Sequence, residues 1–577
     1  MTESQVHRQR LFYFRHDVWR RLTTQPLANL RASMFEELTP IKAQELLCSK
    51  KSLGYGSLRL LPKLTGIRPI MNLKRPTQVK SGWGRQARYS YVQSVNSAIA
   101  PVHNMLNYEK TRRGDILGSG MLSVKDIHSQ LKGFKKSMVN RGLNSQTPLY
   151  FVKLDIQSCF DTIPQQSLVR LIEKLVSEEE YNWMKYVEMC PRNEFGDMWQ
   201  AHNQGVHSKP WRKFSERFAS IAKPEHLADA IAGAGVVGKR NSVFIDTTTK
   251  KKNYSSEGLL DVLNEHVQNT LVKIGKKLFR QRNGIPQGSV MSSLLCNLFY
   301  AEMERNELGF LQTDDALFLR YVDDFLLITL DSGIAMDFLR VMLRGQPTYG
   351  VSVNPAKSLV NFAASVDGMQ IPRLVDTSLF PYCGCLIETR TLDIFKDQNR
   401  MLDGAESAAA ALSDSLVVDS ARNPGRFFHQ KVLGSVKQSL HPMYTDTAHN
   451  SLHAVLLNIF KALVGAAMKM YRYTRSLPAR AHPRPEVVVR TVRDAMQLGY
   501  RLIRGQHERC KVTYHQMQYL GAAAFQFVLG RKQTRYAGVL CWLDGMMTEA
   551  LESSPGSGAL LAQVVRTGNL TYGGWRF

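Results

Sequence analysis

The sequence feature that most restricts the fold is an apolar run that contains two adjacent carboxylates. Residues 318–329 read Phe-Leu-Arg-Tyr-Val-Asp-Asp-Phe-Leu-Leu-Ile-Thr, so β-favouring side chains flank Asp323 and Asp324. An apolar run of this kind predicts a buried strand. Two charges at its centre are costly unless they are compensated, and a pair of bound divalent cations is the usual compensation, because carboxylate oxygens suit Mg²⁺. The alternative interpretation is a turn, in which Asp-Asp is common.

A second apolar run with an acidic residue lies upstream. Residues 149–156 read Leu-Tyr-Phe-Val-Lys-Leu-Asp-Ile, and Asp155 interrupts this run. Two such strands side by side would bring Asp155, Asp323 and Asp324 together. Three carboxylates are the minimum for a two-metal phosphoryl-transfer site. In such a site one metal activates the attacking hydroxyl and the other, roughly 3.5–4 Å away, stabilises the leaving phosphate.

The composition favours a basic, multidomain protein. A chain of 577 residues predicts about three or four domains, and a hydrophobic content of 44% is enough for a full core. The net charge is +26, from 75 basic and 49 acidic residues. The basic excess is spread along the chain, which suits a long polyanion such as nucleic acid better than one small anion. A solvated basic surface is the alternative.

The sequence predicts neither a membrane span nor a secretory signal. The longest apolar stretch, 452–468, contains Lys461, and the first eight residues have no apolar segment. The only closely spaced cysteines, Cys383 and Cys385, have no second pair at zinc-site spacing. We therefore expect a reduced intracellular protein without structural disulfides.

Two basic segments near the N-terminus are candidates for binding nucleic acid or nucleotide. Residues 11–22 mix aromatic and charged side chains in an expected helix. Aromatic and arginine side chains can stack on single-stranded RNA, although a plain amphipathic helix would have the same composition. Residues 57–72 predict a strand, a Thr65-Gly66 turn and a second strand, with Lys63 and Arg68 beside the turn. Two cations on a small hairpin can grip a triphosphate, or they can simply be exposed.

Three further positions could contact a nucleotide. The segment from Gly284 to Gly288 predicts a loop whose glycines allow close backbone approach to a ligand, with Gln287 available to hydrogen-bond it; a tight strand–helix loop is the alternative. The ring of Phe160 could stand against a sugar and exclude a 2′-hydroxyl, or pack in the core. Lys357 could protonate a leaving pyrophosphate, or be an exposed strand lysine.

The remaining pattern predicts mixed structure before residue 400 and helices after it. We expect helices in 81–148, in 334–343 and within the long stretch between Asp161 and Gly284, including one near 259–274. Lys250–Lys252 is expected to be a solvated loop, and 379–392 a strand, turn and strand. Beyond the Ala-rich 405–411, long helices are expected, with one at 451–477 and a proline-containing joint at 478–485.

The order of these segments resembles the telomerase reverse transcriptase family, over about residues 2–545. The Thr2-Glu3 start and Leu11-Phe-Tyr-Phe-Arg-x-x-x-Trp19 resemble the second half of the T motif, and Ile67-Arg-Pro-Ile-Met-Asn72 resembles the fingers motif. Leu106-Asn-Tyr-Glu109 with Arg112 and Arg113 resembles the segment between fingers and palm. Lys153-Leu-Asp-Ile-x-x-x-Phe-Asp161 resembles motif A, and Gln281-x-x-Gly-Ile-Pro-Gln-Gly-Ser289 with Leu295-Cys296 resembles motif B′. Val322-Asp-Asp324, Asn354-x-x-Lys357 with Val360-Asn-Phe362, and Phe380-Pro-Tyr-Cys-Gly384 resemble motifs C, D and E.

Three features depart from the family pattern. Tyr321 stands before Val-Asp-Asp where the family more often has Leu, and Phe160 stands where Tyr is frequent. The chain also begins inside the T motif, so we expect a truncated gene product or a shortened chain, whose Met1 need not be the natural start. Val-Asp-Asp and Pro-Gln-Gly occur in many reverse transcriptases. The T-motif remnant, the motif B′ form, the Phe-Pro-Tyr-Cys-Gly turn and the long insertion before motif B′ are more specific to this family.

The resemblance implies an α+β right-hand polymerase fold with a mostly helical thumb. The implied domains are an RNA-binding-domain remnant (1–50), fingers (51–148), palm with motif A (149–164), a helical insertion in the fingers (165–280), palm with motifs B′, C, D and E (281–398), and thumb or C-terminal extension (399–577). The resemblance implies that they close into a ring around an RNA–DNA hybrid. The implied activity is RNA-templated addition of telomeric repeats to chromosome 3′ ends. The implied location is the nucleus, at telomeres, with no membrane association.

The resemblance also implies roles for individual residues. Asp155, Asp323 and Asp324 would bind two Mg²⁺ ions, and Lys357 would act as a general acid. Lys63, Arg68, Phe160, Gln287 and Gly288 would bind the incoming dNTP. Tyr382, Cys383 and Gly384 would seat the single-stranded telomeric DNA primer, and Phe12, Tyr13, Arg15 and Trp19 would contact the telomerase RNA that supplies the template. Accessory telomerase and telomere proteins would be further partners. The alternatives are a retroelement or group-II-intron reverse transcriptase, and an inactive fragment that only binds RNA or the hybrid.

Overall fold

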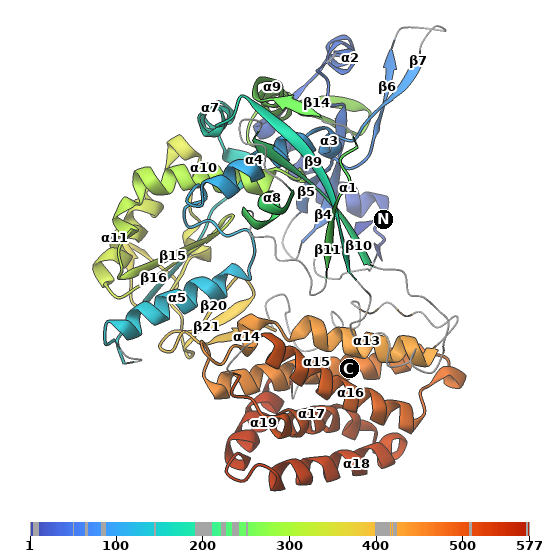
Figure 1. The fold of residues 1–577 in the computed structure, drawn as a ribbon. Helices are drawn as coiled ribbons and strands as arrows, with labels where there is room; N and C mark the ends of the chain where they lie inside the picture. The colour runs from blue at the N-terminus through green and yellow to red at the C-terminus, as the bar shows by residue number, and fades with distance from the viewer. Residues whose placement is uncertain are drawn as a thin grey trace.

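The chain folds into an upper mixed lobe, a central sheet with its helices, and a lower helical bundle (Figure 1). The computed structural model describes residues 2–3, 11–49, 51–63, 67–81, 88–143, 146–190, 211–220, 227–233, 242–249, 252–398, 416, 418, 424–506, 510–572 and 575. The expected Thr65-Gly66 turn, most of the Lys250–Lys252 run and the Ala-rich segment 405–411 lie outside these residues. Lys252 is described: it is exposed and lies outside the helices and strands, as expected, and its Nζ lies 4.7 Å from the centre of the Tyr254 ring.

The central sheet, which we call the palm sheet, carries both acidic runs. It is antiparallel, in the order β15 (Ala316–Tyr321), β16 (Asp324–Thr329), β8 (Tyr150–Asp155) and β17 (Leu359–Val360). Both of its faces are buried. Phe325 and Leu327 of β16 belong to one core cluster, and the alternating Leu326 and Ile328 belong to another. Burial on both sides explains why this run is continuously apolar rather than alternating.

Helices and a small sheet cover the palm sheet. α10 (Ser292–Glu307) and α11 (Ser332–Leu343) contribute to the first core cluster, and α5 (Asp126–Asn140) contributes to the second. The small antiparallel sheet of β20 (Leu379–Tyr382), β21 (Cys385–Glu388) and β22 (Ile394–Lys396) also packs in the second cluster. The expected helix at 334–343 and the strand–turn–strand at 379–392 are therefore confirmed.

The upper lobe contains the expected hairpin within a five-stranded sheet. β4 (Tyr55–Pro62) pairs antiparallel with β5 (Ile67–Asn72), as predicted. The full order is β3 (Phe35–Glu37), β14 (Lys277–Gln281), β13 (Leu271–Ile274), β4 and β5. β13 pairs in parallel with β4. The end of the long stretch between Asp161 and Gly284 therefore lies beside the hairpin.

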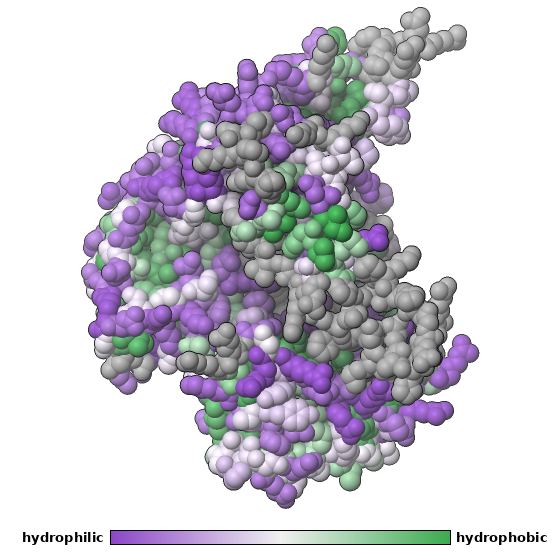
Figure 2. Space-filling view, in the orientation of Figure 1, coloured by the Kyte–Doolittle hydropathy of each residue, from purple (hydrophilic) through white to green (hydrophobic). Residues whose placement is uncertain are grey.

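The expectation of a helical insertion over 165–280 is wrong for most of its described part. α7 (Gln165–Leu175) is followed by an antiparallel sheet in which β9 (Glu180–Cys190) pairs with β10 (Trp211–Ser220), β11 (Val243–Asp246) and β12 (Asn253–Ser255). Two helices, α8 (Leu227–Gly233) and α9 (Ser256–Gln268), lie between or after these strands. The helix expected at 259–274 therefore ends six residues early, at Gln268, and β13 begins at Leu271. Figure 2 shows hydrophobic side chains gathered over the sheet of β9 to β12, where Phe214, Val243 and Ile245 are exposed.

The N-terminal segments also differ from the expected helices. The described part of 81–148 starts with a hairpin of β6 (Thr77–Ser81) and β7 (Arg88–Val92) before α3 (Val95–Ala98), α4 (Ala100–Arg112) and α5. The helix expected from residue 11 begins at His16, because Leu11 and Phe12 form β2 and pair with β1 (Thr2–Glu3). α1 (His16–Met34) and α2 (Pro40–Cys48) complete this region.

The C-terminal region is a helical bundle, as expected. Its helices are α13 (Pro424–Ser439), α14 (Pro442–Thr445), α15 (Leu452–Ser476), α16 (Pro485–Gln506), α17 (Tyr514–Leu529), α18 (Gln533–Glu552) and α19 (Gly558–Tyr572). α15 is long and apolar enough to cross a membrane, but 83% of its most hydrophobic 18-residue window is buried in this bundle. Its composition is therefore that of a central core helix.

Candidate active site

A tight turn presents the two adjacent carboxylates. Tyr321 and Asp324 pair across the β15–β16 hairpin, which leaves Val322 and Asp323 as its two turn residues. Val322 has φ +58°, a left-handed conformation that is unusual and strained for a β-branched residue. The carboxylates therefore stand at the end of the strands, not within one buried strand as first expected. Both sequence interpretations were partly right, because apolar strands flank a turn. We call Tyr321–Asp324 the acidic turn.

The strand register brings the third carboxylate to this turn. β16 pairs with β8 so that Asp324 lies opposite Asp155. The backbone N–H of Ile156 donates to the carbonyl of Asp323 at 3.2 Å, which fixes the end of β8 against the turn. The backbone positions of Asp155, Asp323 and Asp324 are thus brought to the same end of the sheet.

The negative charges of Asp155, Asp323 and Asp324 lie close enough at the acidic turn to affect one another. Burial, together with the charges of the neighbouring Asp324 and Asp155, raises the pKa of Asp323 to about 6. The Lys357 Nζ lies 3.1 Å from the Asp155 Oδ2. Burial lowers the pKa of Lys63, as do Arg68 and Lys357, while Asp155 and Asp323 act in the opposite direction. Lys63, Arg68 and Lys357 thus lie within electrostatic range of one another and of the carboxylates.

The carboxylates fit a divalent cation that substrate helps to hold. Within the described part of the chain, no three His, Cys, Asp or Glu side chains converge into a ready-made metal cage. Mg²⁺ commonly keeps several waters and is held by one or two carboxylates plus substrate phosphates. The unfavourable burial of the Asp323 charge beside two other carboxylates is the situation that a cation would relieve.

The turn between β20 and β21 lies directly against the acidic turn. The Tyr382 hydroxyl donates to the carbonyl of Asp324 at 3.1 Å, and the Cys383 Sγ lies 3.7 Å from the Asp324 Oδ2. Cys383 and Gly384 both have positive φ, +46° and +83°, as in a type I′ hairpin turn. Three residues singled out from the sequence thus sit beside the carboxylates.

The glycines of the 284–288 loop contact the protein itself. A Cβ on Gly284 would lie 2.3 Å from the Phe160 carbonyl oxygen, and a Cβ on Gly288 would lie 2.2 Å from the Met71 carbonyl oxygen. These glycines therefore let the loop pack against β5 and against the segment after β8. Their close approach to a ligand stays a prediction. Gln287 is likewise engaged, since its Nε2 donates to the Asp161 Oδ1 at 3.0 Å.

Phe160 is half-buried at the edge of the first core cluster. Its carbonyl accepts a hydrogen bond of 2.7 Å from Ile285 N–H, so its backbone is tied to the 284–288 loop. Both sequence interpretations of its ring, core packing and contact with a nucleotide, are compatible with this position.

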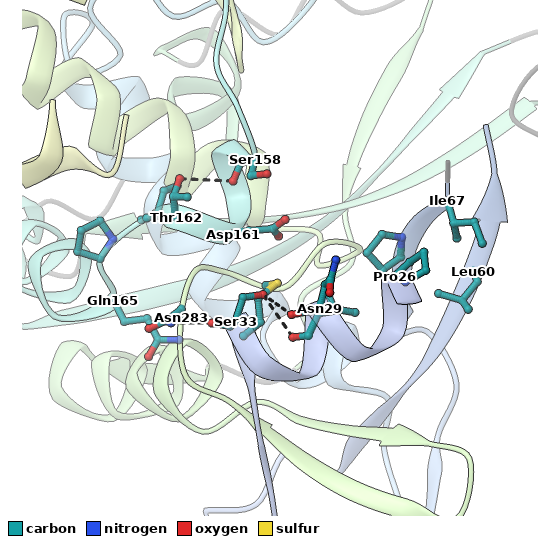
Figure 3. Close-up of a pocket in the computed structure, with 15 residues that line it drawn as sticks. Pro26, Asn29, Ser33, Leu60, Ile67, Ser158, Asp161, Thr162, Gln165 and Asn283 are labelled. Carbon is teal, nitrogen blue, oxygen red and sulfur yellow. Dashed lines mark hydrogen bonds between the residues drawn. The ribbon is translucent and has the colours of Figure 1, made fainter. Parts of the chain in front are cut away.

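A cleft of about 670 Å³ opens beside these residues. Figure 3 shows side chains of α1 facing those of the segment after β8, with the β4–β5 hairpin at one end. Its lining comprises Pro26, Asn29, Leu30, Ser33, Met34, Leu60, Ile67, Pro69, Ser158, Asp161, Thr162, Ile163, Pro164, Gln165 and Asn283. Asp161 belongs to the motif A resemblance but was not predicted as a site residue. Its position six residues after Asp155 was the available signal.

The aromatic and basic side chains near the N-terminus lie in β2 and around the start of α1. Tyr13 is 76% exposed, and Phe12 is half-buried in β2. Arg15 is paired with Asp17 at 3.0 Å, and the Trp19 ring lies 5.3 Å from that of Phe14. These four residues therefore stay near one another in β2 and around the start of α1.

The fold and the site define a class of protein: a reverse-transcriptase-type polymerase domain joined to a helical C-terminal extension. The family model for reverse transcriptase (RNA-dependent DNA polymerase) matches residues 246–376. The model for the telomerase reverse transcriptase C-terminal extension matches 426–544, and that for the RNA-binding domain of the telomerase ribonucleoprotein complex matches 1–30. Reverse transcriptases generally use divalent metal ions. The chain belongs to the telomerase reverse transcriptase family.

Known relatives agree with this assignment. The chain is 30% identical to telomerase reverse transcriptase of Canis lupus familiaris over 522 residues, which cover 88% of this chain and 44% of that protein. It is 29% identical to the protein of Bos taurus over 558 residues, which cover 94% of this chain and 47% of the relative. The chain thus spans less than half the length of these relatives. A solved telomerase from Candida albicans, in complex with a TWJ fragment of telomeric RNA, has the same fold, with a TM-score of 0.61 and 17% identity over 94% of this chain and 73% of that one.

Proposed function

We propose that this chain is the catalytic part of a telomerase, which adds deoxynucleotides to telomeric DNA 3′ ends by copying an RNA template. The observation that carries this proposal is the register that sets Asp324 opposite Asp155 at the acidic turn. Three carboxylates at one end of a palm sheet suit in-line attack of a primer 3′-hydroxyl on the α-phosphate of a dNTP. Matches to the telomerase RNA-binding domain and C-terminal extension favour a telomerase over a retroelement or group-II-intron reverse transcriptase.

The chain's own residues would bind and orient the reactants. Asp155, Asp323 and Asp324 would hold two Mg²⁺ ions, which supply activation of the hydroxyl and charge neutralisation of the leaving phosphate when bound. Lys63 and Arg68 would grip the triphosphate. Lys357, which lies beside Asp155, would protonate the leaving pyrophosphate.

The neighbouring elements would position the base, the primer and the RNA. Phe160 would contact the sugar of the dNTP. Gln287 and Gly288 would lie along the nascent pair, with Gln287 exchanging its bond to Asp161 for one to the nucleotide. Tyr382, Cys383 and Gly384 would seat the primer end, and Phe12, Tyr13, Arg15 and Trp19 would bind telomerase RNA.

We further propose the domain boundaries and cellular context that the family implies. Residues 1–50 would be the end of the RNA-binding domain, 51–148 and 165–280 the fingers, 149–164 and 281–398 the palm, and 399–577 the thumb. The protein would work in the nucleus at telomeres, as a ribonucleoprotein with accessory telomerase and telomere proteins. Its charge of +26 would favour association with RNA and DNA phosphates.

Primer extension tests the proposed function. The assay uses a DNA primer annealed to an RNA template, with Mg²⁺ and dNTPs, and compares the wild type with Asp323→Ala. We expect the variant to lose extension by at least about 1,000-fold, since one metal-binding carboxylate is removed, while its affinity for the hybrid stays within about twofold. The matched control is Asp337→Ala, which alters an exposed carboxylate of α11 and should extend like the wild type.

The competing interpretations give other results. Extension by Asp323→Ala at the wild-type rate would contradict the metal site. Salt-dependent hybrid binding without extension by the wild type would identify an inactive binding fragment.

A further inference from the structure

The largest fully buried side chain in the described part of the chain is a cation close to the acidic turn. Arg320 is completely buried in β15, three residues before Asp323. Its Nε bonds the Glu304 carboxylate, and its NH1 donates to the Asn297 Oδ1 at 2.6 Å. Its NH2 donates to the carbonyl of Asn297 at 3.0 Å. Both partner residues lie on α10, so the guanidinium fastens β15 to this helix.

Arg320 also fastens the connection between α4 and α5. This connection, residues 113–125, runs along β15, the edge strand of the palm sheet. Met121 N–H donates to the Arg320 carbonyl at 2.7 Å, and Arg320 N–H donates to the Ser119 carbonyl at 3.1 Å. Glu304 accepts a further hydrogen bond of 2.8 Å from Ser119 N–H. The ion pair and the backbone bonds thus clamp this segment on the sheet edge.

The glycines of this segment indicate close packing around the ion pair. A Cβ on Gly118 would lie 2.4 Å from the Glu304 Oε2, and a Cβ on Gly120 would lie 2.8 Å from the Arg320 NH2. Gly118 also has φ +56°. The buried ion pair of Arg320 and Glu304 is therefore closely surrounded by α10, β15 and the α4–α5 connection.

The ion pair of Arg320 and Glu304 lies next to the strained part of the acidic turn. Arg320 pairs with Phe325 in the hairpin, and the next pair, Tyr321 with Asp324, closes the turn. The guanidinium carbon lies 5.9 Å from the centre of the Phe325 ring. A left-handed valine in the turn persists only where the surrounding structure holds it in place. On the β15 side, the contacts of Arg320 do this.

We propose that Arg320 is a positioning residue for the metal-binding turn: with Glu304 and Asn297 it holds the β15–β16 hairpin so that Asp323 and Asp324 face Asp155. This inference rests on the proposed function. Arg320 does not touch the reacting groups. A buried ion pair commonly adds little net stability compared with a neutral packed pair, so a contribution to geometry is the better explanation for a guanidinium that makes several directed hydrogen bonds here.

The test separates positioning from stability by replacing the pair rather than breaking it. In the double variant Arg320→Met with Glu304→Gln, no unpaired buried charge remains, so the melting temperature should stay within a few degrees of the wild type. We expect Mn²⁺ affinity, measured by electron paramagnetic resonance without nucleic acid, to be at least about tenfold weaker. In primer extension we expect a roughly 10- to 100-fold lower kcat with an unchanged KM for dNTP.

Two further variants decide the remaining cases. Arg320→Lys keeps the charge but cannot bridge Glu304 and Asn297 as a planar fork, so it should show an intermediate loss; wild-type Mn²⁺ affinity in this variant would overturn the proposal even if the double variant fails to fold. Leu463→Ala, in the core of the C-terminal bundle, should lower stability without changing Mn²⁺ affinity. If it weakens Mn²⁺ binding equally, the effect is general destabilisation and the proposal fails.

The readouts also distinguish this proposal from the proposed function. If the wild type binds Mn²⁺ but extends no primer, the proposed function fails while the Mn²⁺ affinities still test Arg320. If the double variant folds and both its Mn²⁺ affinity and its kcat lie within about twofold of the wild type, Arg320 does not position the turn.

Discussion

Single residues in this molecule show how burial changes the behaviour of ordinary titratable groups. Asp323 and His266 are both removed from water, with opposite consequences: burial raises the pKa of Asp323 to about 6 and lowers the pKa of His266 to about 4. In each case the neutral form is favoured. For Asp323 the unfavourable charge can be offset by a cation. For His266, a fully buried residue of α9, the neutral imidazole is retained and bonds the Ser289 hydroxyl at 2.9 Å.

His266 should make stability depend on pH. The unfolded chain takes up a proton on this residue near pH 6.5, whereas the folded chain does so only near pH 4. Its contribution is therefore complete above pH 6.5 and is lost as the pH falls toward 4, by about 3 kcal/mol. His266→Gln keeps a group that can bond Ser289 but does not titrate. We expect urea unfolding at pH 7.5 and 4.5 to show a smaller loss for His266→Gln than for the wild type.

The matched control is His16→Gln, at an exposed position in α1. This variant should follow the pH dependence of the wild type. Parallel curves for wild type and His266→Gln would show that His266 is protonated in the folded state and would contradict this explanation.

At the scale of elements, the 284–288 loop and the segment after β8 depend on each other. Ile285 N–H donates to the Phe160 carbonyl, Gln165 Nε2 donates to the Gly284 carbonyl, and Gln287 bonds Asp161. Because the second segment continues directly from β8, the loop supports the strand end that carries Asp155. The glycines are required by this packing and by their backbone conformation.

Two glycines with the same conformation allow this dependence to be measured. Gly284 has φ +68° and no space for a Cβ, whereas Gly275, in the β13–β14 turn, has φ +64° and open space around it. Gly275→Ala should cost about 1 kcal/mol, the strain of a left-handed alanine. Gly284→Ala should cost about 2–4 kcal/mol, because the Phe160 backbone must also move, and should lower kcat roughly 10- to 100-fold. Equal unfolding free energies and equal primer extension for the two variants would show that the loop can shift without effect.

At the scale of the whole molecule, a buried polar junction joins α5, which packs on the palm sheet, to the C-terminal bundle. The Asp446 side chain is 2% exposed, and its Oδ2 lies 3.1 Å from the His128 Nε2 and 2.7 Å from the Lys132 Nζ, both on α5. Its Oδ1 accepts a bond of 2.9 Å from Ala448 N–H. A second contact follows nearby, where Lys135 Nζ donates to the His449 carbonyl at 2.7 Å. These contacts fix the bundle relative to the palm sheet.

Removing the charge of Asp446 should weaken this junction. Asp446→Asn is expected to lower the free energy of unfolding by about 2 kcal/mol, since charge-assisted hydrogen bonds to two α5 side chains are lost. It should also increase proteolytic cleavage between the palm and the bundle. Asp367→Asn, at an exposed turn between β18 (Ser365–Val366) and β19 (Met369–Gln370), is the control and should behave like the wild type. Unchanged unfolding and cleavage for Asp446→Asn would mean that apolar packing alone holds the bundle.

The sequence by itself determined the elements whose signal is local. The apolar runs around Asp155 and Asp323, the β4–β5 hairpin, α11 and α15 were predicted because side-chain periodicity and turn residues act over a few residues. The set of carboxylates and the family were determined in the same way, from short motifs in order.

Only the tertiary structure decided the features that depend on distant partners. The β9–β12 sheet was taken for helices, because its strands are separated by long polar segments and their pairing has no local pattern. The packing of the 284–288 glycines against other parts of the chain could not be predicted, because the backbones that they contact come from β5 and from the segment after β8. The register that sets Asp324 opposite Asp155, and the burial of Arg320 against Glu304, arise from side chains and strands that meet only when the chain is folded.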